Sequence, residues 1–380
     1  MTIYLDHAAT TPVRREVLEA MWPWFTGSFG NPSSHHEVGE AAARGLAAAR
    51  DSIAAALDCR PSEVVFTSGG TEANNLAIKG IALAAPRGRH IVTTAIEHEA
   101  VLASCDYLRR HHGFEITLVP LGDGGLVDPD DVAAALRPDT TIVTIMHANN
   151  EVGTVQPIRT IADVARAAGV PIHTDAVQSA PWLDVGLRTL GVDALSLSGH
   201  KLGAPKGIGV LAVRGSVPLE PVLHGGGQER GRRSGTENVA GAVGLAEAIR
   251  LRASASASIG DAVRRSRDAI IDGVLGAVPG AFLTGHRDAR LPAHASFCFP
   301  GTSGEAVLLE LERRGIVSSS GSACAAGSDD ASHVLVALGI DDDTARTAVR
   351  FTLDSTIVEA DAARVVSAVA VAVAAVGSLR

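Results

Sequence analysis

The 380-residue sequence has only four cysteines, and no two of them form a C-x-x-C pair. Cys59, Cys105, Cys298 and Cys324 lie far apart along the chain, so neither a disulfide framework nor a zinc site built on paired cysteines is indicated. Widely spaced single cysteines are typical of proteins kept in a reducing compartment. We therefore expect a cytoplasmic protein.

An excess of basic residues and a leader segment are also absent. The net charge of −9 argues against a general nucleic-acid binder, because little positive charge can neutralise phosphates, although "RRSGT" and "ERGRR" could form a local basic patch.

The start "MTIYLDHAATTPV" has no basic end followed by an apolar core, which predicts no secretory signal. The C-terminal "ARVVSAVAVAVAAVGSLR" favours an amphipathic helix over a membrane span.

Short β-branched runs alternate with helical segments over the first two thirds of the chain. The expected strands lie in "EVVFTSGG", "RHIVTTAIEH", "FEITLVPL", "TTIVTIMHANN", "VPIHTDAVQS", "VDALSLSGHK" and "IGVLAVR". Strands that alternate with helices indicate an α/β fold with a mostly parallel sheet covered on both faces.

The pattern changes near residue 255, where "ASASAS" is either a soft hinge or the middle of a long helix. Beyond it, "HASFCFPG" and "AVRFTLD" predict strands, and "SGEAVLLELERRGI" and the C-terminal run predict helices, which together indicate an α+β module. We expect a large domain over residues 16–255 and a small domain formed by residues 1–15 and 256–380.

Polar clusters follow five of the expected strands. They are Ser68 to Thr71, Glu97-His98, Asn149 to Glu151, Asp175 to Gln178 and Ser198 to Lys201. Ligands of parallel sheets bind outside the carboxyl ends of the strands, so these clusters predict one shared site.

The segment "FTSGGTEANNLAIKG" places Gly69, Gly70 and Thr71 between a strand and a helix. Free backbone N–H groups and the helix dipole favour a phosphate there, although a tight turn capped by Thr71 would have the same sequence. The chain contains no G-x-x-x-x-G-K-[ST], and this segment is not G-x-G-x-x-G, which disfavours Walker-type and dinucleotide sites.

Two further strand ends carry ionisable groups. In "HTDAVQS", Asp175 either caps the next helix or faces a heterocyclic nitrogen and keeps it protonated. In "SLSGHK", Ser198 and His200 are phosphate donors beside Lys201, a lysine placed to act as a nucleophile on an aldehyde. A phosphate site, a carboxylate and a strand-end lysine are what pyridoxal phosphate requires.

At this point the sequence resembles the cysteine desulfurases of the nitrogen-fixation and iron–sulfur-cluster type, within the class V aminotransferase family. The resemblance covers nearly the whole chain and rests on "YLDHAATTP", "GNPSSHH", "FTSGGTEANNLAIKG", "EHEAVL", "NNEVGTVQPI", "HTDAVQS", "SGHKLGAPKGIG", "GGGQERGRRSGT", "SSGSACAAG" and "VRFTL". It implies the fold type I of pyridoxal-phosphate enzymes, with a seven-stranded sheet in the large domain.

The resemblance implies a role for each cofactor-site residue. Lys201 matches the lysine that binds the cofactor aldehyde, and Lys206 matches a position without a covalent role. His98 matches the histidine that stacks on the ring and is a candidate for proton transfer. Asp175 matches the partner of the pyridinium nitrogen, and Gln178 matches the donor to the phenolic oxygen.

The cofactor phosphate and the substrate have their own matches. The phosphate ligands are Thr71, beside Gly70, with Ser198 and His200. The family forms homodimers, and Thr236 would reach the phosphate in the partner subunit.

Asn150 and Arg350 match the groups that hold the substrate carboxylate, and Asn150 also borders the cofactor. A planar arginine fork suits a carboxylate.

Cys324, in "SSSGSACAAGSDDASHVL", matches the nucleophile. By composition alone, a cysteine among small residues is as readily a small buried hydrophobe. The resemblance implies that Cys324 takes sulfur from L-cysteine as a persulfide, that L-alanine is released, and that the sulfur passes to an acceptor protein. Iron–sulfur clusters, tRNA thiolation and DNA backbone modification are the open pathways, with no direct nucleic-acid binding expected of this chain.

The sequence departs from the common family pattern at Ala204, at Pro181-Trp182 and at Asp354-Ser355, none of which removes a catalytic group. The last pair puts the loop shape near Arg350 in question.

Three other functions are compatible with the sequence. A selenocysteine lyase would share the fold and cofactor, a class V transaminase would not need Cys324, and a non-catalytic scaffold would bind no cofactor.

Overall fold

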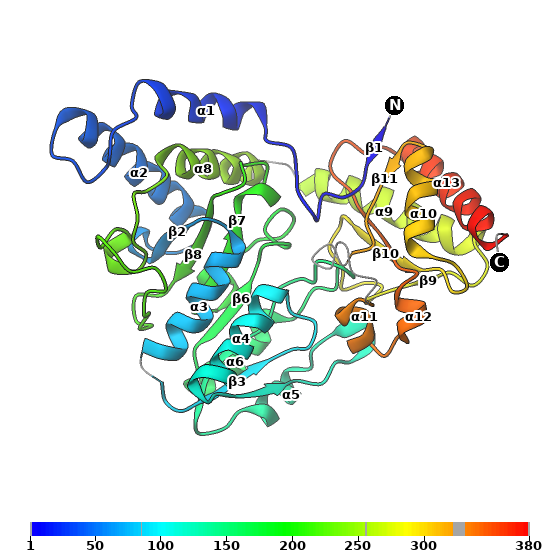
Figure 1. Cartoon of the computed structure of the whole chain (residues 1–380), viewed down its shortest axis with the longest axis horizontal. Coiled ribbons are helices and arrows are strands. Elements are labelled where there is room, and N and C mark those ends of the chain that lie inside the picture. The colour runs from blue at the N-terminus through cyan, green and yellow to red at the C-terminus, as the bar shows by residue number, and fades with distance from the viewer. Residues whose placement is uncertain (1, 85, 255–256, 322–330, 379–380) are drawn as a thin grey trace.

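The computed structural model describes residues 2–84, 86–254, 257–321 and 331–378, and its centre is a seven-stranded sheet (Figure 1). In spatial order the strands are β2 (Val64–Thr67), β8 (Gly209–Val213), β7 (Ala194–Ser198), β6 (Ile172–Asp175), β5 (Thr140–Thr144), β3 (His90–Thr93) and β4 (Glu115–Leu118). Strand β8 runs antiparallel to both of its neighbours, β2 and β7, and the other four pairs in this sheet are parallel. The predicted α/β fold with a mostly parallel seven-stranded sheet is confirmed.

Both faces of this sheet are buried. Successive side chains of a strand point to opposite faces, so Val64 and Phe66 of β2 join one apolar cluster and Val65 joins the other. The first cluster includes side chains of α1 (Arg15–Thr26), α2 (Glu37–Ala56), α5 (Pro129–Ala135), α6 (Ile158–Ala167), α7 (Leu187–Leu190) and α8 (Val239–Ala253). The second contains α3 (Gly70–Ala84) and α4 (Glu99–His112). Helices on both faces explain why every residue of β2, β3, β5, β6, β7 and β8 is buried.

A further apolar cluster contains Ile3, Leu5 and side chains between residues 263 and 376. It surrounds the antiparallel sheet β12 (Val349–Thr352), β10 (His294–Cys298) and β9 (Phe282–Leu283). Strand β1 (Ile3–Tyr4) pairs in parallel with β11 (Ile316–Val317), which brings the N-terminal residues to this group. We propose that these elements form the small domain and that the seven-stranded sheet with its helices forms the large one.

The remaining α-helices lie together on one side of the molecule (Figure 1). They are α9 (Ala257–Ala277), α10 (Gly304–Arg313), α11 (His333–Ala337), α12 (Asp342–Ala345) and α13 (Glu359–Gly377). Side chains of α9, α10 and α13 belong to the cluster around Ile3, whereas those of α11 and α12 form a separate cluster with Ile96 and Val152. By length and composition, α13 is the one helix in the described ranges that could cross a membrane. One face of it is nevertheless buried in the same cluster as Ile3, through Val365, Val369 and Val376.

The "ASASAS" segment spans the end of α8 and the start of α9. Helix α8 ends at Ala253 and α9 begins at Ala257, and residues 255–256 lie outside the described ranges. The choice between a hinge and a continuous helix therefore stays open.

Candidate active site

A cavity of about 850 Å³ lies at the carboxyl ends of the parallel strands. It brings together the predicted site residues Gly70, Thr71, His98, Asn150, Asp175, Gln178, Ser198, His200, Lys201 and Arg350. They come from turns after β2, β3, β5, β6 and β7 and from β12, as the position of the polar clusters predicts.

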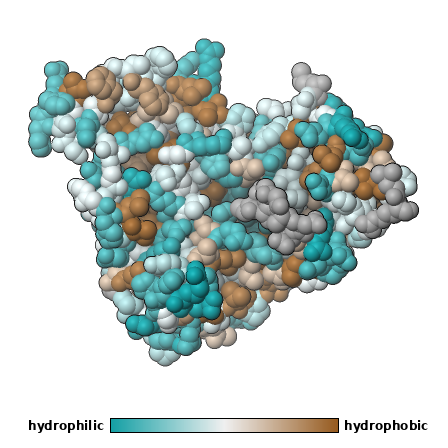
Figure 2. All heavy atoms as spheres, in the orientation of Figure 1, coloured by the Kyte–Doolittle hydropathy of each residue, from teal (hydrophilic) through white to brown (hydrophobic). Residues whose placement is uncertain are grey.

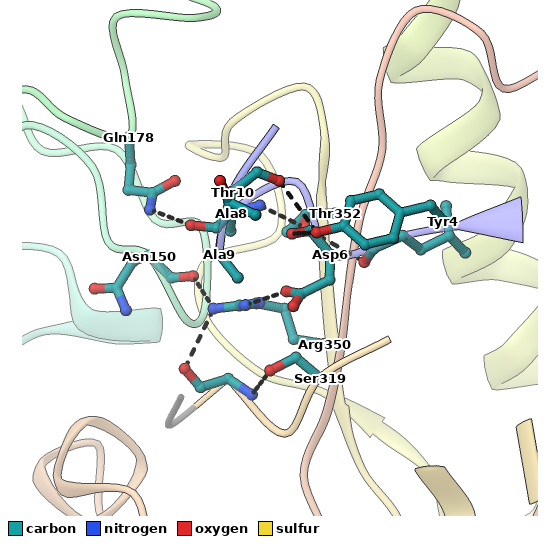
Figure 3. Close-up of polar contacts among 12 residues, drawn as sticks. Tyr4, Asp6, Ala8, Ala9, Thr10, Asn150, Gln178, Ser319, Arg350 and Thr352 are labelled. Atoms are coloured by element: carbon teal, nitrogen blue, oxygen red, sulfur yellow. Dashed lines mark hydrogen bonds and ion pairs between the residues drawn. The ribbon is translucent and has the colours of Figure 1, made fainter. Parts of the chain in front are cut away.

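Lys201 lies against the N-terminal segment of the chain. It belongs to the short 3₁₀ turn Gly199–Lys201 after β7, and its Nζ donates to the carbonyl oxygens of Ala8 and Ala9, the latter at 2.7 Å. Gln178 Nε2 donates to the Ala8 carbonyl at 3.0 Å (Figure 3). The N-terminal segment therefore holds the amine and the amide side by side at the cavity wall.

Lys206 also borders the cavity, but its side chain is exposed, whereas Lys201 is half-buried. His200, next to Lys201, contacts Thr10 Oγ1 through Nδ1 at 3.1 Å. Burial and, to a smaller extent, the charges of Lys201 and Lys206 together lower the pKa of His200 to about 4. At neutral pH His200 is therefore a neutral imidazole with one N–H to donate.

The turn between β2 and α3 has the form expected of an anion cradle. A Cβ at Gly70 would lie 2.8 Å from Val177 Cγ2 and 3.4 Å from Ser198 Cβ. Only glycine therefore fits here, against the turn after β6 and the last residue of β7. The first turn of an α-helix leaves backbone N–H groups without helical partners. Thr71 and Ser198 border the cavity beside these N–H groups.

Asp175 is buried at the end of β6, with 6% of its surface exposed. Its Oδ2 accepts from Asn74 Nδ2 at 2.6 Å, and its Oδ1 accepts from the Val177 backbone N–H at 2.9 Å. Residues 176–180 form turns and no helix, so Asp175 does not cap a helix. It presents a fixed carboxylate to the cavity.

His98 caps α4, because its Nδ1 accepts from the Ala100 backbone N–H at 3.0 Å. An acceptor Nδ1 places the proton of the neutral ring on Nε2. The imidazole that borders the cavity is therefore held in one tautomer.

Glu97, next to His98, is a fully buried carboxyl group that the sequence interpretation gave no role. It accepts from Thr94 Oγ1 at 2.7 Å and from the Met146 backbone N–H at 3.0 Å. Burial, with a smaller contribution from the charge of Asp175, raises the pKa of Glu97 to about 8 against the lowering effect of these hydrogen bonds.

This shift predicts a pH-dependent stability. Between about pH 4.5 and pH 8 Glu97 is ionised in the unfolded chain but protonated in the folded one, so the free energy of unfolding falls as the pH rises, by up to about 1.4 kcal/mol per pH unit. Glu97→Gln, which mimics the neutral carboxyl, should lack this contribution. Urea unfolding of both proteins at pH 5, 6, 7 and 8 measures the difference, and parallel curves would contradict it.

Arg350 is buried on β12 and already has a charged partner (Figure 3). Its guanidinium donates to Asp6 Oδ1 at 2.6 Å, to the Asn150 carbonyl at 2.9 Å and to the Gly321 carbonyl at 3.2 Å. The Asp6 contact joins residues 344 positions apart and had no signal in the sequence. The contact with Asp6 fixes the Arg350 guanidinium at the edge of the cavity.

Thr236 and Cys324 differ from the other predicted residues. Thr236 is exposed in the segment between β8 and α8 and does not border the cavity of its own chain. Cys324 lies outside the described residues.

The departures from the common pattern lie beside the cavity and not in it. Pro181, Trp182, Asp354 and Ser355 border a second cavity of about 780 Å³, and Ala204 is buried in the core. Asp354 Oδ2 lies 3.7 Å from His7 Nε2. None of these side chains contacts the Arg350 guanidinium through a described hydrogen bond.

The family follows from comparison of the whole chain. The profile of the family described as Aminotransferase class-V matches residues 3–362. The chain belongs to the class V aminotransferases. Within them it groups with the cysteine desulfurases of the IscS and NifS type, as the motifs predicted.

Three relatives illustrate this placement among the class V aminotransferases. The cysteine desulfurase IscS of Dictyoglomus turgidum is 45% identical over 92% of this chain and 89% of its own. A solved structure of a NifS-like protein superposes with a TM-score of 0.91 at 35% identity, covering 98% of this chain and 100% of that one. SspA, solved in complex with cysteine, has a TM-score of 0.80 at 40% identity, covering 93% and 99%.

Proposed function

We propose that this class V aminotransferase is a pyridoxal-phosphate-dependent cysteine desulfurase that transfers the sulfur of L-cysteine to Cys324 and releases L-alanine. The observation that carries the proposal is the convergence of Lys201, Asp175 and the Gly70 turn on one cavity in a chain of the IscS and NifS type. Relatives across the chain's length bear the name cysteine desulfurase. One solved relative holds cysteine.

The donor set fits pyridoxal phosphate. The Gly70 turn admits an anion close to the helix start, and Thr71, Ser198 and His200 add side-chain donors around it. Asp175 would face the pyridinium nitrogen, and Gln178 the phenolic oxygen. When bound, the cofactor supplies an electron sink for the bond that breaks at the substrate Cα.

The residues of this chain would divide the remaining work. Lys201, oriented by the Ala8 and Ala9 carbonyls, would hold the aldehyde carbon of the cofactor and would receive or return protons at Nζ. His98 would stack on the ring and carries its proton on Nε2, the nitrogen opposite its helix-capping contact.

Arg350 and Asn150, which also line the cavity, would hold the substrate carboxylate. A guanidinium that is fixed beforehand by Asp6 and two carbonyls loses little freedom when it binds a carboxylate. The carboxylate would then aim the thiol of the substrate toward Cys324.

The enzyme would act in the cytoplasm as a homodimer and pass its sulfur to an acceptor protein. Exposed apolar side chains on α1 and the segment after it, Leu18, Trp22, Phe25 and Phe29, form a surface suited to a second subunit. Figure 2 shows hydrophobic side chains along α1. Thr236, exposed and away from its own cavity, would contribute to the partner's site.

Product analysis tests this function against its alternatives. With L-cysteine and a reductant, we expect alanine and sulfide in equal amounts, and no keto acid. A keto acid in place of alanine would indicate a transaminase. Release of selenide from selenocysteine with no sulfide from cysteine would indicate a selenocysteine lyase.

A further inference from the structure

Ala8 joins the lysine of the candidate site to a strand of the three-stranded sheet. Its carbonyl oxygen accepts from Lys201 Nζ and, at 3.0 Å, from Gln178 Nε2. The next carbonyl, that of Ala9, accepts from the same Nζ at 2.7 Å. The Ala8 N–H donates to Thr352 Oγ1 at 2.9 Å, and Thr352 is the last residue of β12 (Figure 3). One residue thus carries both an acceptor that orients Lys201 and a donor that Thr352 holds.

The Thr352 hydroxyl group makes this contact out of reach of water, because only 1% of the residue's surface is exposed. The same Oγ1 donates to the Leu5 carbonyl at 3.4 Å. The Thr352 backbone holds the segment independently, since its N–H donates to the Leu5 carbonyl at 2.7 Å and its carbonyl accepts from the His7 N–H at 3.4 Å. Removing the hydroxyl group alone would therefore keep the backbone pairing and deprive the Ala8 N–H of its acceptor.

Arg350 lies two residues before Thr352 on β12, so the two side chains point to the same face of the strand. Their contacts with the N-terminal segment are nevertheless separate. Arg350 donates to Asp6 Oδ1 at 2.6 Å and to the Asn150 carbonyl at 2.9 Å, and neither bond involves the Thr352 hydroxyl group. The roles of Thr352 and Arg350 can therefore be tested apart.

We propose that Thr352 is a positioning residue for Lys201. Its hydroxyl group fixes Ala8, and the Ala8 and Ala9 carbonyls set where the Lys201 amine lies. Thr352 would act through this backbone and not on the cofactor or the substrate. A reactive group displaced by about 1 Å loses up to about 100-fold in rate.

This role rests on one step of the proposed function, the attachment of pyridoxal phosphate to Lys201. In that step the neutral Lys201 amine replaces the aldehyde oxygen, which leaves as water with the two protons of the amine. The role does not depend on the later transfer of sulfur to Cys324.

The test measures how fast the full-length chain, freed of cofactor, attaches pyridoxal phosphate added at a saturating concentration. Borohydride reduction at set times, followed by peptide mass spectrometry, quantifies the attachment to Lys201. We expect Thr352→Val, which keeps the shape of the side chain and removes its hydroxyl group, to slow this attachment about 10-fold or more. Thr352→Ser, which keeps the hydroxyl group, should be close to the wild type.

Thr347→Val is the matched control. Thr347 Oγ1 also accepts from a buried backbone N–H, that of Phe299, at 2.9 Å, and it donates to the Thr344 carbonyl at 2.7 Å. Thr347 is not among the described residues that line either cavity. Both valine variants should lose similar thermal stability, but Thr347→Val should attach the cofactor at the wild-type rate.

Steady-state kinetics of the holoenzyme supply a second readout. In Thr352→Val we expect kcat for alanine formation to fall while KM for cysteine stays unchanged, because Arg350 keeps its contacts with Asp6 and Asn150. A raised KM at the wild-type kcat would place the effect on Arg350 and would overturn the inference.

A wild-type attachment rate in Thr352→Val would also overturn it, as would an equal loss of rate in Thr347→Val or Thr352→Ser. The proposed function fails on a different result. If the enzyme formed a keto acid in place of alanine, that function would be wrong, while slower attachment in Thr352→Val would still support the role of Thr352.

Discussion

Lys201→Ala is expected to lose the visible absorbance of covalently held pyridoxal phosphate and to lower cysteine turnover by at least about 1,000-fold. The reason is geometric. Lys201 Nζ is the amine that the Ala8 and Ala9 carbonyls hold beside Gln178. Absorbance spectra of the purified holoenzyme and steady-state alanine formation measure the two effects.

Lys206→Ala is the matched control for this prediction. Lys206 lies five residues further on and borders the same cavity, but its side chain is exposed. The Lys206 variant should keep the spectrum and most of the activity. A Lys206 variant that loses the spectrum while Lys201→Ala keeps it would reverse the assignment.

Cys324→Ala is expected to reduce sulfide and alanine release by about 1,000-fold or more, while cofactor binding is retained. The other cysteines are poor substitutes as nucleophiles. Cys105 and Cys298 are buried, Cys59 is partly buried, and burial raises the pKa of each thiol to about 12. Because the thiolate is the reactive form, none of the three is ionised at neutral pH.

Cys59→Ala provides the comparison, since Cys59 is the most accessible of these three thiols. It should behave as wild type in both assays. Full sulfide release by Cys324→Ala would remove Cys324 from the mechanism.

Much of the fold could be predicted because its signals are local. Most strands of the large sheet are short runs with β-branched residues, such as Val64–Thr67, and parallel pairing then brings the turns after the parallel strands to one edge. The strands β1, β9 and β11 were not predicted. Each has two residues, which is too short to show any periodicity.

The site was predicted as a set of ligands but not as a network. The contacts of Arg350 with Asp6 and of Lys201 with Ala8 join parts of the chain far apart in sequence, and no spacing rule reports such pairs. Glu97 and Glu151 were also unassigned, because a glutamate is usually exposed and its burial depends on the packing around it. Function therefore followed from motifs, whereas the support of each group required the structure.

If Cys324 is the nucleophile, it carries the sulfur of L-cysteine as a persulfide. Mass spectrometry of the holoenzyme after brief reaction with L-cysteine, without reductant, detects this sulfur. We predict that the peptide containing Cys324 gains the mass of one sulfur atom, that a reductant removes it, and that one alanine appears for each persulfide formed. Alanine release with no added sulfur on that peptide, or with the sulfur on Cys59, Cys105 or Cys298, would contradict the account.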